Sequence, residues 1–240
     1  MATTLSVYRW SPGGPERWQP FTVEAGVDTT VLDALVEIQR RQDPSLAFRY
    51  TCRVGMCGSC AMTVNGRSRW TCRTHVDKVA ENSALEIAPL RNLPVVRDLV
   101  TDMAPFFDKW ARARGRFRGA ATRKDGFARV APASAQRRLA DAGIECIGCG
   151  VCYSGCDVVS WNPDYLGPAA LNRAWTLVND ARDVDQRERL AAVAGDAGCH
   201  SCHTMMSCTE LCPKQLSPTR SISGLKRATM GLALRAEEPE

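Results

Sequence analysis

Long apolar runs are missing from this sequence of 240 residues, and its first residues do not have the pattern of an export signal. A membrane-spanning helix needs roughly 18 to 20 apolar residues without interruption, and no segment approaches that length. We therefore expect the chain to reach a bilayer only through partner subunits or a surface patch. The start MATTLSVYRW has no basic stretch followed by an apolar core, so we expect no secretory signal.

Cysteine, in contrast, is abundant. Twelve cysteines fall into two groups, at residues 52–72 and at residues 146–212. In an exported protein they could pair as disulfides, but that interpretation requires an export signal, which we do not expect here. We therefore expect a reducing compartment, in which the thiols can bind metal. The gap between the two groups favours two domains, which we place at residues 1–105 and 106–240.

The first domain is expected to form a small sheet around one helix. Aromatic and β-branched residues predict a two-stranded hairpin at 5–10 and 18–24. Thr30, with Asp33 three residues later, can cap the helix that follows. Asn65-Gly66, between two short runs, predicts a second hairpin.

Past Pro94 the apolar residues have helical spacing, and we expect no further strands. The acidic end EEPE is expected to fray. The predicted helical segments are VVRDLV, DMAPFFDKW, SAQRRLADA, PAALNRAWTLVNDARD, DQRERLAAVA and a last helix opened by Ser217-Pro218.

Residues 109–138 contain ten Lys or Arg and a single acidic residue, Asp125, so this stretch carries +9 while the whole chain carries +5. Such a stretch can bind nucleic acid. It can equally face anionic lipid headgroups or an acidic partner subunit. A solvated surface is the commonest role for a run of this kind.

The first four cysteines have the plant-type ferredoxin spacing C-x4-C-x2-C, with the last cysteine after eleven further residues. This loop must curl so that its thiolates point at two irons, and Gly55 and Gly58 permit the tight backbone required. Zinc is the alternative metal, but zinc sites usually have two short CxxC knuckles. We predict a 2Fe-2S cluster on Cys52, Cys57, Cys60 and Cys72.

Residues 146–156 have the bacterial ferredoxin spacing C-x2-C-x2-C-x3-C, in which the fourth cysteine serves the other of two clusters. A partner run must therefore exist, and residues 202–212 provide it, followed by Pro213. Exchange of the two last cysteines places both clusters in one domain, as electron transfer requires. We predict a 4Fe-4S cluster on Cys146, Cys149, Cys152 and Cys212.

The partner run has Met205 where its second cysteine is expected. Methionine is a poor ligand at that corner, so three thiolates remain for the second cluster. We predict a 3Fe-4S cluster on Cys156, Cys202 and Cys208. Cys199 is surplus, either as a buried thiol or as a substitute ligand, and His200 and His75 are assigned no role.

Elements and motifs together predict an α+β chain. An N-terminal β-grasp domain of the 2Fe-2S ferredoxin type is followed by an all-helical domain that resembles bacterial ferredoxins and carries two clusters.

Four stretches resemble the iron-sulfur subunit of the succinate dehydrogenase and fumarate reductase family: FRYTCRVGMCGSCAMTVNG, CIGCGVCYSGCDVVSWNPDYLGPAAL, NDARD and CHTMMSCTELCPK. The resemblance covers nearly the whole chain. It implies that electrons from FAD on a separate flavoprotein subunit pass the 2Fe-2S, 4Fe-4S and 3Fe-4S centres in turn and leave to a quinone. The absence of a GxGxxG dinucleotide loop agrees with a flavin held elsewhere.

The resemblance also implies membrane anchor subunits, which would hold this chain peripherally at the cytoplasmic face of the cell inner membrane, and no nucleic acid partner. Trp161 and His203 match the family residues that line the quinone pocket, where indole N-H and imidazole can donate hydrogen bonds to a quinone oxygen. Asp157 departs from the family, because many members have Pro at this place.

Three other interpretations stay open. One is the electron carrier of a glycolate oxidase or heterodisulfide reductase type of complex, with two four-iron clusters, against which Met205 argues. The second is a zinc-stabilised nucleic-acid-binding protein that uses the basic stretch. The third is a soluble ferredoxin acting alone, which would not need the segment NPDYLGPAAL.

Overall fold

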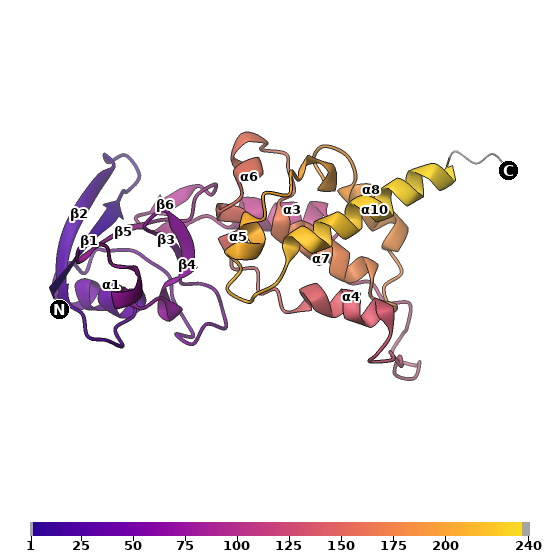
Figure 1. The fold of residues 1–240 in the computed structure, drawn as a ribbon, viewed down its shortest axis with the longest axis horizontal. Helices are drawn as coiled ribbons and strands as arrows, with labels where there is room; N and C mark the ends of the chain where they lie inside the picture. Colours follow the sequence, from indigo (N-terminus) through magenta and orange to yellow (C-terminus); the bar gives the residue numbers. More distant parts are fainter. Residues whose placement is uncertain (1, 237–240) are drawn as a thin grey trace. The chain divides into compact units, whose positions relative to one another are not determined.

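The computed structural model describes residues 2–236 and is shown in Figure 1, where the colours follow the sequence. The chain divides into two compact units. Unit 1 consists of Met1–Ala104 together with Ile147–Gly155. Unit 2 consists of Pro105–Cys146 and Cys156–Glu240. The predicted domain border between residues 105 and 106 stays a prediction, and the fraying expected for EEPE falls outside the described residues.

Unit 1 is built on a mixed five-stranded sheet with the strand order β2-β1-β5-β3-β4. Strands β1 and β5 are parallel, and the other neighbouring pairs are antiparallel. Both predicted hairpins are confirmed, and Asn65 and Gly66 have the positive φ values of 48° and 70° that the tight turn requires. The strands are β1 (Ala2–Arg9), β2 (Arg17–Glu24), β3 (Ala61–Val64), β4 (Arg67–Trp70) and β5 (Ala84–Ala88).

One long helix, α1 (Val31–Arg41), lies along one face of this sheet (Figure 1). The predicted cap is present: the Asp33 N-H donates to Thr30 Oγ1 at 3.1 Å, and the Thr30 N-H donates to the Asp33 carboxylate at 3.2 Å. The buried face of α1 packs with alternate residues of the strands, such as Leu5 and Ile87. Each fully buried Val, Leu or Ile contributes about 1.5–3 kcal/mol, so this core holds the unit together.

The prediction of a helix over VVRDLV was wrong. The segment forms a two-stranded ribbon instead, β6 (Val95–Arg97) and β7 (Val100–Thr101). Asp98 turns the chain between them with a φ of 46°. Its buried carboxylate accepts hydrogen bonds from Arg9 Nε at 3.1 Å and from the Ala47 N-H at 2.9 Å. These are tertiary contacts with distant parts of the chain, and such contacts outweigh the weak local preference for helix that the apolar spacing indicates.

Unit 2 is helical, with α7 at its centre in contact with α4, α8 and α10 (Figure 1). The helices assigned to this unit by sequence are confirmed, except that α7 ends before NDARD. The α+β class is confirmed as well. Besides α1, the helices of the two units are η1 (Thr71–Arg73), α2 (Val76–Val79), α3 (Ala104–Arg112), α4 (Ala135–Ile144), α5 (Val151–Ser154), α6 (Asp157–Trp161), α7 (Pro168–Val178), α8 (Gln186–Val193), η2 (Cys199–Ser201), α9 (Ser207–Glu210) and α10 (Pro218–Ala236).

Helix α10 is the longest, with 19 residues, and its Gly224 lies against the indole of Trp175, where an added Cβ would come within 2.5 Å of the ring. None of the described helices combines the length and the apolar character needed to cross a bilayer.

A buried ion pair holds the start of the basic stretch against α8. The Arg189 side chain, with no exposed surface, donates two hydrogen bonds to the Asp183 carboxylate, at 2.7 and 3.2 Å. It also donates to the carbonyl oxygens of Arg114 and Arg116, each at 2.9 Å. The Arg118 N-H donates to Asp183 at 3.1 Å. The first part of the basic stretch is therefore fixed by NDARD and α8.

Burial opposes ionisation of Asp183, but the hydrogen bonds from Arg189 and from two backbone N-H groups outweigh it and hold the pKa of this carboxyl below its usual value. An unperturbed Asp has a pKa of about 4. Because the pKa of Asp183 is lower in the folded state, the pair stabilises the fold at pH values above about 4, and this stability is lost as the pH falls through the lowered pKa.

We predict that Arg189→Met lowers the free energy of unfolding by about 3 kcal/mol, because it leaves the buried Asp183 charge and two carbonyl oxygens without their donor. Urea denaturation followed by far-UV circular dichroism measures the loss. Arg187→Met, on an exposed position of the same helix, is the control and should change stability by less than about 0.5 kcal/mol. Equal midpoints for the two variants would contradict the prediction.

Candidate metal centres

The first cysteine loop, residues 51–60, has no helix or strand and ends at β3. Gly55 and Gly58 both have a φ of +72°, a conformation that glycine adopts at little cost. These two turns fold the loop back on itself. The fourth cysteine of the set, Cys72, comes from η1, directly after β4, and is buried. The hairpin turn at Asn65 therefore sets where Cys72 meets the loop.

The four cysteines of this set lie together. Cys52 Sγ accepts hydrogen bonds from the backbone N-H groups of Met56 and Cys57, each at 3.3 Å. The Cys72 thiol interacts with those of Cys60 and Cys52. Four sulfurs with backbone N-H donors around them are the donor chemistry that an iron-sulfur cluster requires, so these residues fit a 2Fe-2S cluster.

The thiols of this loop differ in acidity. A hydrogen bond with Ser59, whose Oγ lies 3.1 Å from Cys57 Sγ, lowers the pKa of the exposed Cys57 thiol to about 6. Burial, with the Cys60 thiol next to it, raises the pKa of Cys72 to about 11. Because clusters bind thiolates, metal binding at this loop must release the proton of Cys72.

The residues predicted for the 4Fe-4S cluster come from both units. Cys149 and Cys152 lie in Ile147–Gly155, which belongs to unit 1, and Cys152 is buried in α5. Cys146 and Cys212 belong to unit 2.

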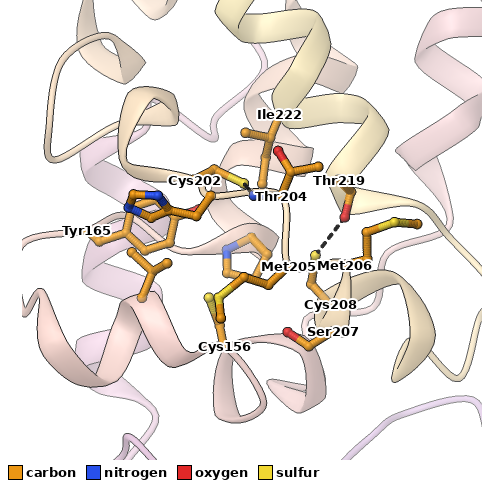
Figure 2. Close-up of a pocket in the computed structure, with 13 residues that line it drawn as sticks. Cys156, Tyr165, Cys202, Thr204, Met205, Met206, Ser207, Cys208, Thr219 and Ile222 are labelled. Atoms are coloured by element: carbon orange, nitrogen blue, oxygen red, sulfur yellow. Dashed lines mark hydrogen bonds between the residues drawn. The ribbon is translucent and has the colours of Figure 1, made fainter.

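The residues predicted for the 3Fe-4S cluster, in contrast, line a single pocket of unit 2 (Figure 2). Its space free of atoms is about 320 Å³, the open mouth included. Cys156 enters from the N-terminal end of α6, Cys202 follows η2, and Cys208 lies in α9. The structure thus brings together three thiols that are up to 52 positions apart in the sequence.

Polar groups around this pocket can stabilise thiolates. Thr219 Oγ1 lies 3.3 Å from Cys208 Sγ, and the Thr204 N-H donates to Cys202 Sγ at 3.4 Å (Figure 2). Burial raises the pKa of Cys156 and of Cys208. The Thr219 hydroxyl opposes this change at Cys208, and the backbone N-H groups of Val158 and Val159 oppose it at Cys156. The set fits a cluster that supplies positive charge from its irons and so keeps buried sulfurs ionised.

Met205 lines the same pocket and is half-exposed, with 52% of its surface accessible. The position that the cysteine spacing assigns to a further ligand therefore carries a thioether beside the three thiols.

Tyr165 lines this pocket too, and the sequence alone did not single it out. Its ring is almost completely buried, and its hydroxyl interacts with the Cys202 thiol. Burial, together with the charge of the neighbouring thiolates, raises the pKa of Tyr165, so the phenol stays protonated and can donate. The position of this tyrosine, four residues after Trp161, does not predict its contact with Cys202, because the contact depends on the tertiary fold.

The two residues matched to a quinone pocket lie next to each other. The rings of Trp161 and His203 meet edge to face, with centroids 6.2 Å apart and planes at 76°. Trp161 is 59% exposed, and His203 is exposed and lines the mouth of the pocket with the three cysteines. The neighbouring Asp157 is exposed on the first turn of α6.

Cys199 differs from the cysteines of the pocket. It has no exposed surface, and its Sγ lies 3.8 Å from Thr229 Oγ1. It is not one of the described residues that line the pocket. His200 Nε2 lies 3.1 Å from the same hydroxyl. Within residues 2–236, no group of three or more His, Cys, Asp or Glu is arranged as a site for a metal ion. The ligand sets stay predictions, supported by the contacts above.

We predict that Cys199→Ala keeps the full iron content and lowers stability by about 1 kcal/mol, because it removes only a buried sulfur and its contact with Thr229. Iron per chain and the thermal midpoint of anaerobically purified protein measure this. Cys208→Ala, also at a buried thiol, is the comparison and should lose iron. An equal loss of iron in both variants would make Cys199 a ligand.

Comparison with known proteins agrees with this geometry. Residues 4–108 match the model of a 2Fe-2S iron-sulfur cluster binding domain, and residues 145–217 match that of a 4Fe-4S dicluster domain. The chain is 36% identical over 230 residues to the mitochondrial succinate dehydrogenase iron-sulfur subunit 1 of Oryza sativa, covering 93% of this chain and 81% of that protein.

Two further relatives extend this finding. The mitochondrial succinate dehydrogenase iron-sulfur subunit of Candida glabrata is also 36% identical, over 93% of this chain and 90% of its own. A chain of the Mycobacterium smegmatis Sdh1 complex in the apo form superposes with a TM-score of 0.84 at 28% identity, over 99% of this chain and 98% of that one. The two cluster-binding domains in one chain, and relatives of this identity over nearly its full length, place it in the family of succinate dehydrogenase iron-sulfur subunits, which transfer electrons through iron-sulfur clusters.

Proposed function

We propose that this chain conducts electrons between the flavin of a partner catalytic subunit and a membrane quinone, through three iron-sulfur centres. The observation that carries the proposal is the pocket in which Cys156, Cys202 and Cys208 gather while Met205 stands beside them. Three thiolates suit a 3Fe-4S cluster, and Trp161 and His203 lie next to this pocket. Cluster and quinone residues are therefore neighbours, as an exit for electrons requires.

The ligands that we propose for the three clusters are those of the sequence prediction. Cys52, Cys57, Cys60 and Cys72 would hold 2Fe-2S; Cys146, Cys149, Cys152 and Cys212 would hold 4Fe-4S; Cys156, Cys202 and Cys208 would hold 3Fe-4S. The clusters supply one-electron redox chemistry when bound. The protein contributes thiolates, N-H and hydroxyl donors to sulfur, and exclusion of water.

The partners that we propose are a flavoprotein subunit with FAD and membrane anchor subunits, which would hold the chain peripherally at the cytoplasmic face of the inner membrane. The Oryza and Candida relatives are named as iron-sulfur subunits of succinate dehydrogenase (ubiquinone). These names support a complex with partner subunits and a quinone as the electron acceptor. We also propose the division into domains at residues 1–105 and 106–240.

An anaerobic redox titration of the complex, followed by EPR, tests the proposal as a whole. We expect three centres with the signals of 2Fe-2S, 4Fe-4S and 3Fe-4S clusters. Zinc with negligible iron in anaerobically purified protein would overturn it.

We predict that Met205→Cys converts the three-iron centre into a four-iron one, because it supplies a thiolate at the remaining corner. The oxidised variant should lose the three-iron EPR signal and contain one more iron per chain. Met206→Cys, at the next residue and in the same pocket but out of register, is the matched control and should keep the three-iron signal. An unchanged signal in Met205→Cys would count against the assignment.

We predict that Trp161→Leu slows quinone reduction by about tenfold or more, since it removes an indole N-H that donates to the quinone and the ring that packs against His203. Electron transfer from succinate to a soluble dye that accepts electrons ahead of the quinone should be unaffected. Trp18→Leu, at a tryptophan of the sheet that is 46% exposed, is the control. A normal rate with quinone in Trp161→Leu would remove this residue from the site.

A further inference from the structure

The backbone of Gly58, in the first cysteine loop, lies against Cys149. A Cβ added at Gly58 would fall 2.4 Å from Cys149 Cβ, 3.1 Å from Cys149 Cα and 3.2 Å from Ile147 Cδ1. Real Cβ atoms do not approach other atoms as closely as 2.4 Å. The nearest atom, Cys149 Cβ, is bonded directly to the backbone and cannot move aside as the end of a long side chain could. Gly58 is buried, so no solvent fills this contact. Only glycine therefore permits the approach.

The contact is held in place from the side of Cys149. Ser154, two residues after Cys152, is completely buried, and its Oγ lies 2.8 Å from Ser68 Oγ of β4. The same Oγ accepts a hydrogen bond from the Arg91 N-H at 2.8 Å. Asn92 Nδ2 donates to the carbonyl oxygens of Tyr153 and Ser154. Residues 147–155 are thus fixed to the sheet that carries the first cysteine loop.

The two sides of this contact belong to different predicted clusters. Gly58 lies between Cys57 and Cys60, which we assign to the 2Fe-2S cluster, and Cys149 is assigned to the 4Fe-4S cluster. Electron tunnelling weakens steeply with distance, and it weakens more across a gap than through bonded or tightly packed atoms. A backbone packed directly against a predicted ligand of the next cluster therefore offers the electron a short route through protein atoms.

We propose that Gly58 is a positioning residue for electron transfer: its missing side chain lets the 2Fe-2S loop touch Cys149, and this contact is the route of the electron to the 4Fe-4S centre. The inference rests on the ligand sets of the proposed function. In the step one electron leaves the first centre, which is oxidised, and enters the second, which is reduced. No covalent bond forms or breaks.

Gly58→Ala in the assembled complex tests the route, with two comparison variants chosen for the same backbone conformation. Gly66→Ala, at a φ of +70° in the β3–β4 turn with no atom within 4 Å of the added Cβ, reports the cost of the conformation alone. Gly55→Ala, at the same φ of +72° in the same loop, meets the side chains of Arg73 and Trp70 instead of Cys149. It reports strain within the cluster loop.

Two measurements are made on each variant: EPR of every centre, including the magnetic interaction between the first two, and the rate at which an electron given by flash photoreduction redistributes between them. In Gly58→Ala we expect both centres with a severalfold slower redistribution, or a selective loss of the 4Fe-4S signal as Cys149 is displaced. Neither effect is expected in Gly66→Ala or Gly55→Ala.

A redistribution rate in Gly58→Ala equal to that in Gly55→Ala, with all centres present, would overturn the inference. Damage confined to the 2Fe-2S signal in both variants would overturn it as well, since strain in the loop would then explain the effect. Failure of the proposed function is distinguishable, because it would appear in the unmodified complex as missing 2Fe-2S and 4Fe-4S signals.

Discussion

Burying a thiolate costs free energy, and much of the structure around the cysteines offsets this cost. Burial raises the pKa of Cys72, Cys156 and Cys208, so each of these groups prefers to keep its proton in the absence of a compensating positive charge. In the proposed ligand sets iron would supply that charge, and hydrogen-bond donors add to it, such as the backbone N-H groups directed at Cys52 Sγ and the hydroxyl of Thr219. The fold therefore places donors where each buried sulfur would otherwise be isolated.

Directing backbone toward sulfur requires conformations and distances that ordinary side chains forbid. In the first loop Gly55 and Gly58 turn the chain at positive φ, and Gly58 also admits Cys149. In the second motif Gly150 has a φ of 78°, and a Cβ there would lie 3.3 Å from the Met103 side chain. In both motifs cysteines that we propose as ligands alternate with glycines that permit close approach.

Much of this was predictable from the sequence, because local chemistry determines it. The Asn65-Gly66 turn, the Thr30 cap and the cysteine spacings depend on residues close together in the chain. The strands β6 and β7 were not predictable, since Asp98 is fixed by Arg9 and by the backbone at Ala47, far away in sequence. The same holds for Tyr165, whose role depends on three cysteines that only the tertiary fold brings to it.

Positive charge near the third cysteine set reduces the cost of gathering thiolates there. Lys109 is buried in α3, where it interacts with Cys156 and Asp164; burial lowers its pKa, and these two negative groups oppose the change. Lys226 of α10 donates to the Cys202 carbonyl oxygen at 2.6 Å. One lysine comes from the basic stretch, which the sequence suggested as a docking surface. The first residue of this stretch, Lys109, is buried and interacts with Cys156, which lines the cysteine pocket, and attraction between opposite charges is stronger away from water.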